Sequence, residues 1–386
     1  MSLNLSARHE WVMQSEIRNM SIECDQMGGI NLSQGVCDTE IPLPVRRATQ
    51  EAIETGVNTY THYAGFPELR EAIAIKQKKF TGMNVNPETE IIVSAGSTGA
   101  LYCACLALLN PGDEVIVFEP YYGYHISTLV VTGAVPVYVR MSPPDWSFLM
   151  DDLEAVVTSR TRGIIINSPA NPSGKVFTEI ELKQLADFST RHDLFVFTDE
   201  IYEHFLYDER KHIPPATLPD MMERTITISG LSKTFSITGW RIGYCICDAR
   251  WAQTIGYFSD LVYVCAPAPL QTGVAKGLIN LETSYYQNLS KEYAKKRDLI
   301  CNGLSLAGLK PNIPQGAYYV LADISSLPGK NSKEKAMYLL SKTGVACVPG
   351  EAFYHDDSGE NLARFCYAKE DSVLEEACNR LVKLKR

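Results

Sequence analysis

Residues 161–202 read TRGIIINSPANPSGKVFTEIELKQLADFSTRHDLFVFTDEIY and contain the pattern that decides the fold. Two runs of β-branched and aromatic residues, at 164–166 and 195–197, enclose a segment with apolar residues at helical spacing. Thr178 is followed three residues later by Glu181, the capping-box pattern of a helix N-terminus. The stretch therefore predicts a strand, a helix and a second strand.

Similar apolar runs occur before and after this unit, with helical patterns between them. Strands that are apolar on both faces are typical of a mostly parallel sheet covered by helices. We therefore expect an α/β fold with a mostly parallel sheet sandwiched by helices. The expected strands are centred on residues 91–93, 115–117, 135–138, 164–166, 195–197 and 225–228.

The pattern changes towards both ends of the chain. A helix is expected over residues 9–26, and residues 34–44 are rich in turn formers. After about residue 285 longer helices alternate with a few strands, expected at 318–322, 345–348 and 364–367, and a last helix runs to the end. We interpret 1–45 as an N-terminal arm and part of a smaller α+β domain, 46–284 as the large domain and 285–386 as the remainder of the smaller one.

Composition excludes several classes of protein. The 386 residues carry 36 Lys and Arg against 45 Asp and Glu, a net charge of −9 that disfavours nucleic acid as a partner. Eleven cysteines are too few for a disulfide scaffold of this length and lack zinc-ligand spacing, so no metal site is expected. No signal peptide or membrane span is apparent, and we expect a cytoplasmic protein.

Polar side chains follow five of the expected strands. In open α/β sheets, ligands bind beyond the carboxyl ends of the strands. The five segments supply a Gly-Ser-Thr-Gly turn at 96–99, tyrosines at 121–122, an amide at Asn171, a carboxylate at Asp199, and Lys233 with Arg241 eight residues later. These groups are expected to meet at one edge of the sheet.

Each group has a chemical use there. A Gly-Ser-Thr-Gly turn that opens a helix presents N–H groups and hydroxyls to an anion. A lysine removed from water beside another cation has a lowered pKa and becomes a nucleophilic amine, as Lys233 near Arg241 would. Asp199 suits either a helix cap or the binding of a cationic ring nitrogen.

Three motifs in this order resemble a known family. They are N-P-x-G from Asn171, D-E-x-Y from Asp199 to Tyr202, and S-K-x-F-x-x-x-G-x-R-x-G from Ser232 to Gly243. The chain resembles the fold-type I pyridoxal-phosphate enzymes, and within them the class I/II aminotransferases, over nearly its whole length.

The resemblance implies a role for each motif residue toward pyridoxal 5'-phosphate. Lys233 would form the Schiff base and then shuttle the substrate proton. Asp199 would pair with the pyridinium nitrogen, and Asn171 and Tyr202 would bind the ring's 3' oxygen. Tyr122 would stack on the ring. The phosphate would be held by Ser97, Thr98, Ser232 and Arg241.

The resemblance also implies a substrate site and a partner subunit. Arg364 would grip the α-carboxylate of an amino-acid or keto-acid substrate, with Gly35 and Asn171 beside it. Tyr60 would reach the phosphate of a neighbouring subunit, which implies a homodimer with shared active sites. Gly230 departs from the family, because many relatives carry a phosphate-binding serine three residues before the lysine.

Several functions compete. The first is an aminotransferase that works by a ping-pong route between an α-amino acid and an α-keto acid. A C–S β-lyase or a decarboxylase would use the same cofactor residues. A serine hydrolase would use Ser97 in a nucleophile elbow with His355, but leaves Lys233 and Arg241 unexplained. A non-enzymatic effector module for a transcription factor is disfavoured by the net charge. Donors of the kynurenine, glutamine, methionine or aromatic type and of the aspartate or alanine type both remain open.

Overall fold

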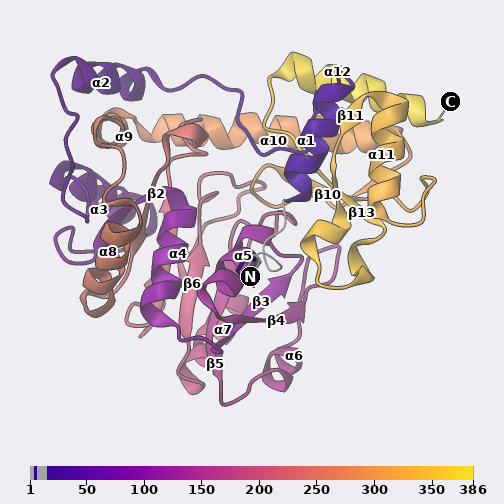
Figure 1. The fold of residues 1–386 in the computed structure, drawn as a ribbon. Helices are drawn as coiled ribbons and strands as arrows, with labels where there is room; N and C mark the ends of the chain where they lie inside the picture. The colour runs from indigo at the N-terminus through magenta and orange to yellow at the C-terminus, as the bar shows by residue number, and fades with distance from the viewer. Residues whose placement is uncertain (1–3, 7–14, 386) are drawn as a thin grey trace.

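A seven-stranded sheet forms the centre of the molecule (Figure 1), as described by a computed structural model of residues 4–6 and 15–385. Its strand order is β2-β8-β7-β6-β5-β3-β4. Strands β7, β6, β5, β3 and β4 are parallel, whereas β8 is antiparallel to both neighbours. The strands are β2 (Ile91–Ala95), β3 (Glu114–Glu119), β4 (Val135–Arg140), β5 (Thr161–Asn167), β6 (Phe195–Asp199), β7 (Thr225–Gly230) and β8 (Ile242–Ile246). The predicted α/β fold is confirmed, and β8 is the strand that the sequence analysis missed.

Helices cover both faces of this sheet because its strands are apolar on both sides. Val115 and Val117 of β3 belong to one buried cluster with residues of α4, whereas Ile116 between them belongs to another with residues of α7. The helices of this part are α2 (Leu43–Glu54), α3 (Pro67–Thr81), α4 (Gly96–Leu108), α5 (Gly123–Thr132), α6 (Met150–Ala155), α7 (Glu179–Arg191), α8 (Ala249–Tyr263) and α9 (Ala268–Asn280).

The predicted capping box starts α7. The Thr178 hydroxyl accepts a hydrogen bond from the Glu181 backbone N–H at 3.2 Å. In return, the Glu181 carboxylate accepts one from the Thr178 N–H at 2.8 Å. Two of the helix's free donors are thereby satisfied.

A second, antiparallel sheet has the order β12-β13-β10-β9, and a separate parallel pair joins β1 to β11. The strands are β1 (Ile30–Asn31), β9 (Lys310–Pro311), β10 (Tyr319–Asp323), β11 (Val345–Ala346), β12 (Val348–Pro349) and β13 (Leu362–Cys366). The expectation of one strand over 345–348 is wrong. Instead, one strand ends at Ala346 and another begins at Val348, with Cys347 between them. The two are separate because β11 pairs with β1 and β12 pairs with β13.

Segments from both chain ends meet around these strands. Helix α1 contacts β1, β11 and β12, and α10 runs along the upper side of the molecule towards α12 (Figure 1). The helices are α1 (Glu16–Gln26), α10 (Thr283–Leu306), α11 (Ser332–Thr343) and α12 (Asp371–Leu381). Short 3-10 turns cover Pro215–Thr217, Thr238–Trp240, Gly350–Phe353, Asp357–Gly359 and Val382–Lys385. Residues 9–14 of the expected first helix lie outside the described residues.

Within the described ranges, none of the helices is long and apolar enough to cross a membrane. All eleven cysteines are free thiols.

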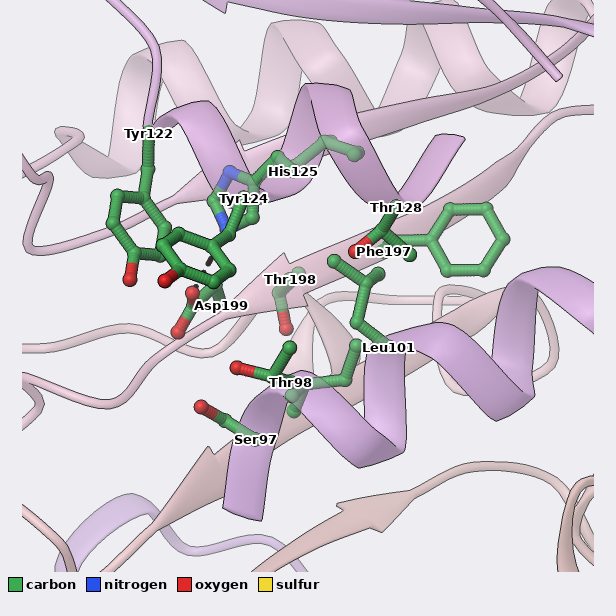
Figure 2. A pocket seen from close by; sticks show the side chains of 12 residues that line it. Ser97, Thr98, Leu101, Tyr122, Tyr124, His125, Thr128, Phe197, Thr198 and Asp199 are labelled. Atoms are coloured by element: carbon green, nitrogen blue, oxygen red, sulfur yellow. Dashed lines mark hydrogen bonds and ion pairs between the residues drawn. The ribbon is translucent and has the colours of Figure 1, made fainter. Parts of the chain in front are cut away.

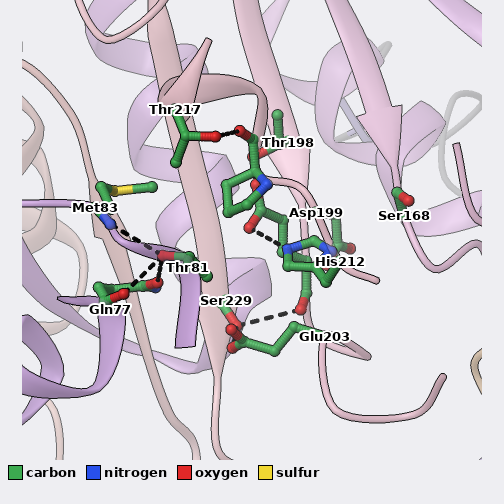
Figure 3. A network of polar contacts seen from close by, with 12 residues as sticks. Gln77, Thr81, Met83, Ser168, Thr198, Asp199, Glu203, His212, Thr217 and Ser229 are labelled. Carbon is green, nitrogen blue, oxygen red and sulfur yellow. Dashed lines mark hydrogen bonds and ion pairs between the residues drawn. The ribbon is translucent and has the colours of Figure 1, made fainter. Parts of the chain in front are cut away.

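A buried polar network joins α3 to the segment that follows β6 and to β7 and β8. Figure 3 shows its contact between Ser229 and Glu203. The ammonium of Lys76 lies 2.5 Å from the Glu203 carboxylate and donates to the Tyr244 hydroxyl at 2.9 Å. The Ser229 hydroxyl donates to the same carboxylate at 2.8 Å. Burial, the largest single effect, raises the pKa of Glu203. The charge and hydrogen bond of Lys76, together with the charges of His204 and His212, outweigh burial and lower that pKa to about 2.

Replacing Glu203 by glutamine should therefore change the acid stability of the protein. A lowered carboxyl pKa contributes stability that is present above about pH 4.5 and is lost as the pH falls towards 2, about 3 kcal/mol in all. Glu203→Gln also leaves the Lys76 charge unpaired, at a cost of about 3–5 kcal/mol at neutral pH. Urea unfolding at about pH 7 and pH 3 should show a less stable variant with a smaller acid loss than wild type.

The control is Glu179→Gln, which removes an exposed i,i+4 partner of Lys183. It should change unfolding little, because solvent screens exposed pairs. Equal acid losses in Glu203→Gln and wild type would contradict the prediction.

Candidate active site

A cleft of about 460 Å³ lies at the carboxyl ends of the central strands. It is also lined by the first turn of α1, the segment after β1 and one residue of β13. The sequence-predicted residues that line it are Gly35, Ser97, Thr98, Tyr122, Asn171, Asp199, Tyr202, Ser232, Lys233, Arg241 and Arg364. Tyr60 is not among the residues that line the cleft of its own chain. Its side chain is 82% exposed.

Lys233 lies in the turn after β7. Its amine donates a hydrogen bond to the Gly35 carbonyl at 3.0 Å and lies 5.7 Å from the centre of the Tyr318 ring. Burial lowers the pKa of Lys233, and the positive charges of Arg241 and Arg364 lower it further, against the opposing effect of the thiols of Cys37 and Cys366. A lowered pKa increases the fraction of neutral, nucleophilic amine.

Asp199 is the last residue of β6, and its carboxylate is held from two sides. Figure 2 shows the side that faces His125. One oxygen lies 2.9 Å from His125 Nε2, and the other accepts from the Ile201 N–H at 3.2 Å. No helix begins at Asp199, so its alternative use as a helix cap does not apply. His125 was missed by the sequence analysis, although it follows Tyr122 by three residues on the first turn of α5.

An anion-binding end forms where α4 begins. Gly96 has a φ of +75°, and a Cβ there would come within 2.1 Å of the Arg241 guanidinium, so only glycine lets that side chain lie so close. Ser97 and Thr98 follow in the first turn, which has no side-chain cap. Its first N–H groups are therefore available to an anion.

The departure at Gly230 has a steric reason. A Cβ on Gly230 would lie 2.9 Å from the Gly243 Cα and 2.9 Å from the Ile242 carbonyl oxygen, both backbone atoms of β8. A serine at this position would require β8 to shift.

Arg364 on β13 is 1% exposed and faces the cleft between two neutral acceptors. It donates to the Asn171 side-chain oxygen at 2.8 Å and to the Ser33 carbonyl at 2.6 Å. Its guanidinium lies 4.3 Å from the centre of the Tyr319 ring. Within residues 4–6 and 15–385, none of the carboxylates forms an ion pair with it, so a carboxylate in the cleft would neutralise a buried charge.

Tyr319 is a second residue that the sequence analysis missed. Its hydroxyl lies 3.0 Å from that of Tyr202, and a Cβ on Gly35 would come within 1.9 Å of it. The glycine therefore allows close approach of the Tyr319 hydroxyl. The only sequence signal was the pair of tyrosines at 318 and 319 in an expected strand.

Comparison with known proteins decides the family. The family model described as "Aminotransferase class I and II" matches residues 28–381. The chain belongs to the class I and II aminotransferases. Aspartate aminotransferase of Pyrococcus abyssi is 36% identical over 99% of this chain and 98% of its own length. Kynurenine--oxoglutarate transaminase of Dictyostelium discoideum is 36% identical over 92% of this chain and 91% of its own.

A solved structure supports the same assignment. N-succinyldiaminopimelate aminotransferase from Mycobacterium tuberculosis matches with a TM-score of 0.95 and 35% identity, over 99% of this chain and 100% of that chain. This aminotransferase is therefore a pyridoxal-phosphate-dependent enzyme that moves an amino group from an α-amino acid to an α-keto acid, as the resemblance implied.

The matches do not favour the β-lyase, decarboxylase or serine hydrolase alternatives. His355, the proposed hydrolase partner of Ser97, lies 2.9 Å from Glu119 and stacks on Tyr138 instead of lining the cleft. The three relatives are named for three different substrates, so the family leaves the amino donor open.

Proposed function

We propose that the cleft around Lys233 is where this aminotransferase binds pyridoxal 5'-phosphate and transfers the amino group. One observation carries the proposal. An amine with a lowered pKa shares the cleft with a hydrogen-bonded carboxylate and three arginines. When bound, the cofactor supplies an aldehyde that condenses with amines and a ring that accepts electrons.

The residues of the cleft fit each part of that cofactor. Arg241 and the start of α4, with Ser97, Thr98 and Ser232, would hold the phosphate by charge-assisted hydrogen bonds. Asp199, oriented by His125, would keep the ring nitrogen protonated. Tyr122 would stack on the ring, and the Asn171 amide and the Tyr202 hydroxyl would bind its 3' oxygen.

The same cleft provides for the substrate. Arg364 would bind the α-carboxylate, because Asn171 and Ser33 already fix its guanidinium in place. Gly35 and Asn171 would border that carboxylate. The Lys233 amine would then take the proton from the substrate Cα, for which a lowered pKa suits it.

Donor panels with 2-oxoglutarate and pyruvate distinguish the kynurenine, glutamine, methionine or aromatic type from the aspartate or alanine type.

The test of the cofactor site is covalent. The purified protein should be yellow, and borohydride should remove the colour and fix a pyridoxyl group on Lys233, located by peptide mass spectrometry. A protein that never binds the cofactor, or a label on another lysine, would overturn the proposal.

We propose further that the enzyme is a homodimer in which Tyr60 reaches the partner's phosphate site. Tyr60 is 82% exposed, and α8 exposes an apolar stretch close by, since the Tyr257 ring contacts Tyr63. The exposed apolar residues on and after α8 are Tyr257, Leu261, Val262 and Val264. A contiguous exposed apolar surface is typical of a protein interface.

Leu261→Asp should dissociate such a dimer. Leu261 is 79% exposed, and a charge buried in an interface costs several kcal/mol. Sedimentation should show a dimer for wild type and a monomer for the variant, with transamination lost together with the dimer. Ile180→Asp on α7, at a residue that is 73% exposed, is the matched control and should stay dimeric. A wild-type monomer that is fully active would contradict the prediction.

The domain limits at residues 45 and 285 and the cytoplasmic location stay predictions from the sequence. We propose that the small domain is built from both chain ends, because β1 pairs with β11 and α1 contacts β12. Limited proteolysis would locate the boundaries.

A further inference from the structure

A second cavity lies apart from the cleft, between the end of α3, the segment that follows β6 and the first half of α10. Its volume is about 650 Å³, compared with about 460 Å³ for the cleft, and the two share no lining residue. Small-molecule sites in proteins occupy about 300–1,000 Å³. The cavity is therefore large enough for a ligand of its own.

Three aromatic rings in mutual contact line this cavity. The centre of the His204 ring lies 4.9 Å from that of Phe80 and 4.5 Å from that of Tyr286, and the Phe80 and Tyr286 rings are 4.8 Å apart. Leu206 and Ala294 add aliphatic surface. Such a lining favours a flat, apolar ligand, because aromatic rings pack well against one another.

The cavity is also lined by residues with buried polar atoms that lack a partner. Within the described residues, His204 Nε2, His212 Nδ1 and the Tyr286 hydroxyl form no hydrogen bond. His204 and Tyr286 are 9% and 4% exposed, and the side chain of His212 is 5% exposed. A buried polar group without a hydrogen bond destabilises the fold, so such groups are few in native proteins. A polar group of a ligand in the cavity would remove this penalty.

The Glu200 carboxylate fixes the role of His212. Glu200 is 1% exposed, and its carboxylate lies 2.7 Å from His212 Nε2. An ionised carboxylate only accepts hydrogen bonds, so Nε2 is the donor. Nδ1 then accepts in the neutral ring and donates in the protonated ring. A hydroxyl on the ligand serves either form, because a hydroxyl both donates and accepts.

The charged residues of the cavity leave a positive surplus at its exposed rim. Glu203 is paired with Lys76 and Asp208 with Arg297, and neither cation lines the cavity. The charged residues that remain are exposed, namely one carboxylate and three cations: Glu209, Arg210, Lys211 and Lys291. This surplus attracts an anionic group to the rim.

We infer that the cavity binds a small aromatic acid that carries a hydroxyl on its ring. The ring packs against Phe80 and Tyr286, the hydroxyl bonds to His212 Nδ1, and the carboxylate faces Lys291 and the other cations of the rim. The site is separate from the cleft and needs no contact with the cofactor.

Calorimetry with the cofactor-loaded enzyme tests the site. The cleft is first filled with aminooxyacetate, whose oxyamine condenses with the cofactor aldehyde. The probes are para-hydroxyphenylpropanoate, phenylpropanoate, which lacks the hydroxyl, and para-hydroxyphenylpropanol, which lacks the charge. Wild type should bind the first at one site per chain and about tenfold tighter than either of the others, because each of these loses one polar contact.

Two variants locate the binding. Ala294→Trp places a large ring where α10 borders the cavity and should abolish binding of all three probes. Asn302→Trp, at an exposed residue of α10 that does not line the cavity, should bind them as wild type does. Tyr286→Phe should weaken para-hydroxyphenylpropanoate about fivefold and leave phenylpropanoate unchanged. Without a probe, its thermal unfolding should match wild type, because the hydroxyl has no partner to lose.

Several results would overturn the inference: no binding to wild type, equal binding of the three probes, or unchanged binding in Ala294→Trp. A less stable Tyr286→Phe enzyme would also overturn it, because the hydroxyl would then serve the fold. If Ala294→Trp does not fold, the two acids measured on Tyr286→Phe decide the case. An enzyme that does not take up the cofactor would refute the proposed function alone, since the probes can still be titrated into this cavity.

Discussion

Lys233→Ala is expected to lower the rate of transamination by about 10⁴-fold or more, because the variant loses both the amine that condenses with the cofactor and the group that moves the substrate proton. The Lys233 amine lies 3.0 Å from the Gly35 carbonyl and has a lowered pKa. An exposed lysine has neither this position nor this pKa and could not replace it. Single-turnover kinetics with excess donor measure the loss. Reduction with borohydride should leave no pyridoxyl group on the variant.

Lys342→Ala, at an exposed lysine in the last turn of α11, is the control. It should retain wild-type turnover and the covalent label on Lys233. Circular dichroism and thermal unfolding test whether Lys233→Ala is folded. Turnover near wild type in a folded Lys233→Ala enzyme would refute the proposed site.

Asp199→Asn is expected to lower kcat by about 10²–10³-fold with a small change in KM. The isosteric amide keeps a hydrogen bond but removes the negative charge that stabilises a protonated ring nitrogen as electrons flow into the ring. Among the described residues, the hydrogen bonds of this carboxylate are those to His125 Nε2 at 2.9 Å and from the Ile201 N–H at 3.2 Å. Because the effect falls on the reacting state, it should appear in kcat.

Asp187→Asn removes an exposed carboxylate on α7 and should change neither constant. An absorbance titration of the bound cofactor provides a second readout, since its response to pH should differ between Asp199→Asn and wild type. If Asp199→Asn raised KM alone, the carboxylate would serve substrate binding and not the ring.

Much of the fold could be predicted because its signals are local. The two-sided burial of β5 and β6 is visible as continuous apolar runs, and the Thr178–Glu181 box marks the start of the helix between them. The chemistry of the cleft is also local in part, because each polar segment directly follows its strand. Asp199 ends β6 and Lys233 lies three residues after β7.

Strand direction and partner could not be predicted in the same way. The residues of β8 form an apolar run like the others, yet β8 is antiparallel to β2 and β7. The division at Cys347 has a similar cause, because β11 pairs with Ile30 and Asn31 while β12 pairs with β13. Pairing between distant segments depends on packing that no short window of sequence contains.

The sequence by itself determined the α/β class and the set of groups that the chemistry needs, because periodicity, caps and strand-end residues are properties of neighbouring positions. Only the tertiary structure placed His125 against Asp199 and the Tyr319 hydroxyl over Gly35. Those contacts join residues far apart in the chain, and their geometry follows from how the helices and both sheets pack around a shared core.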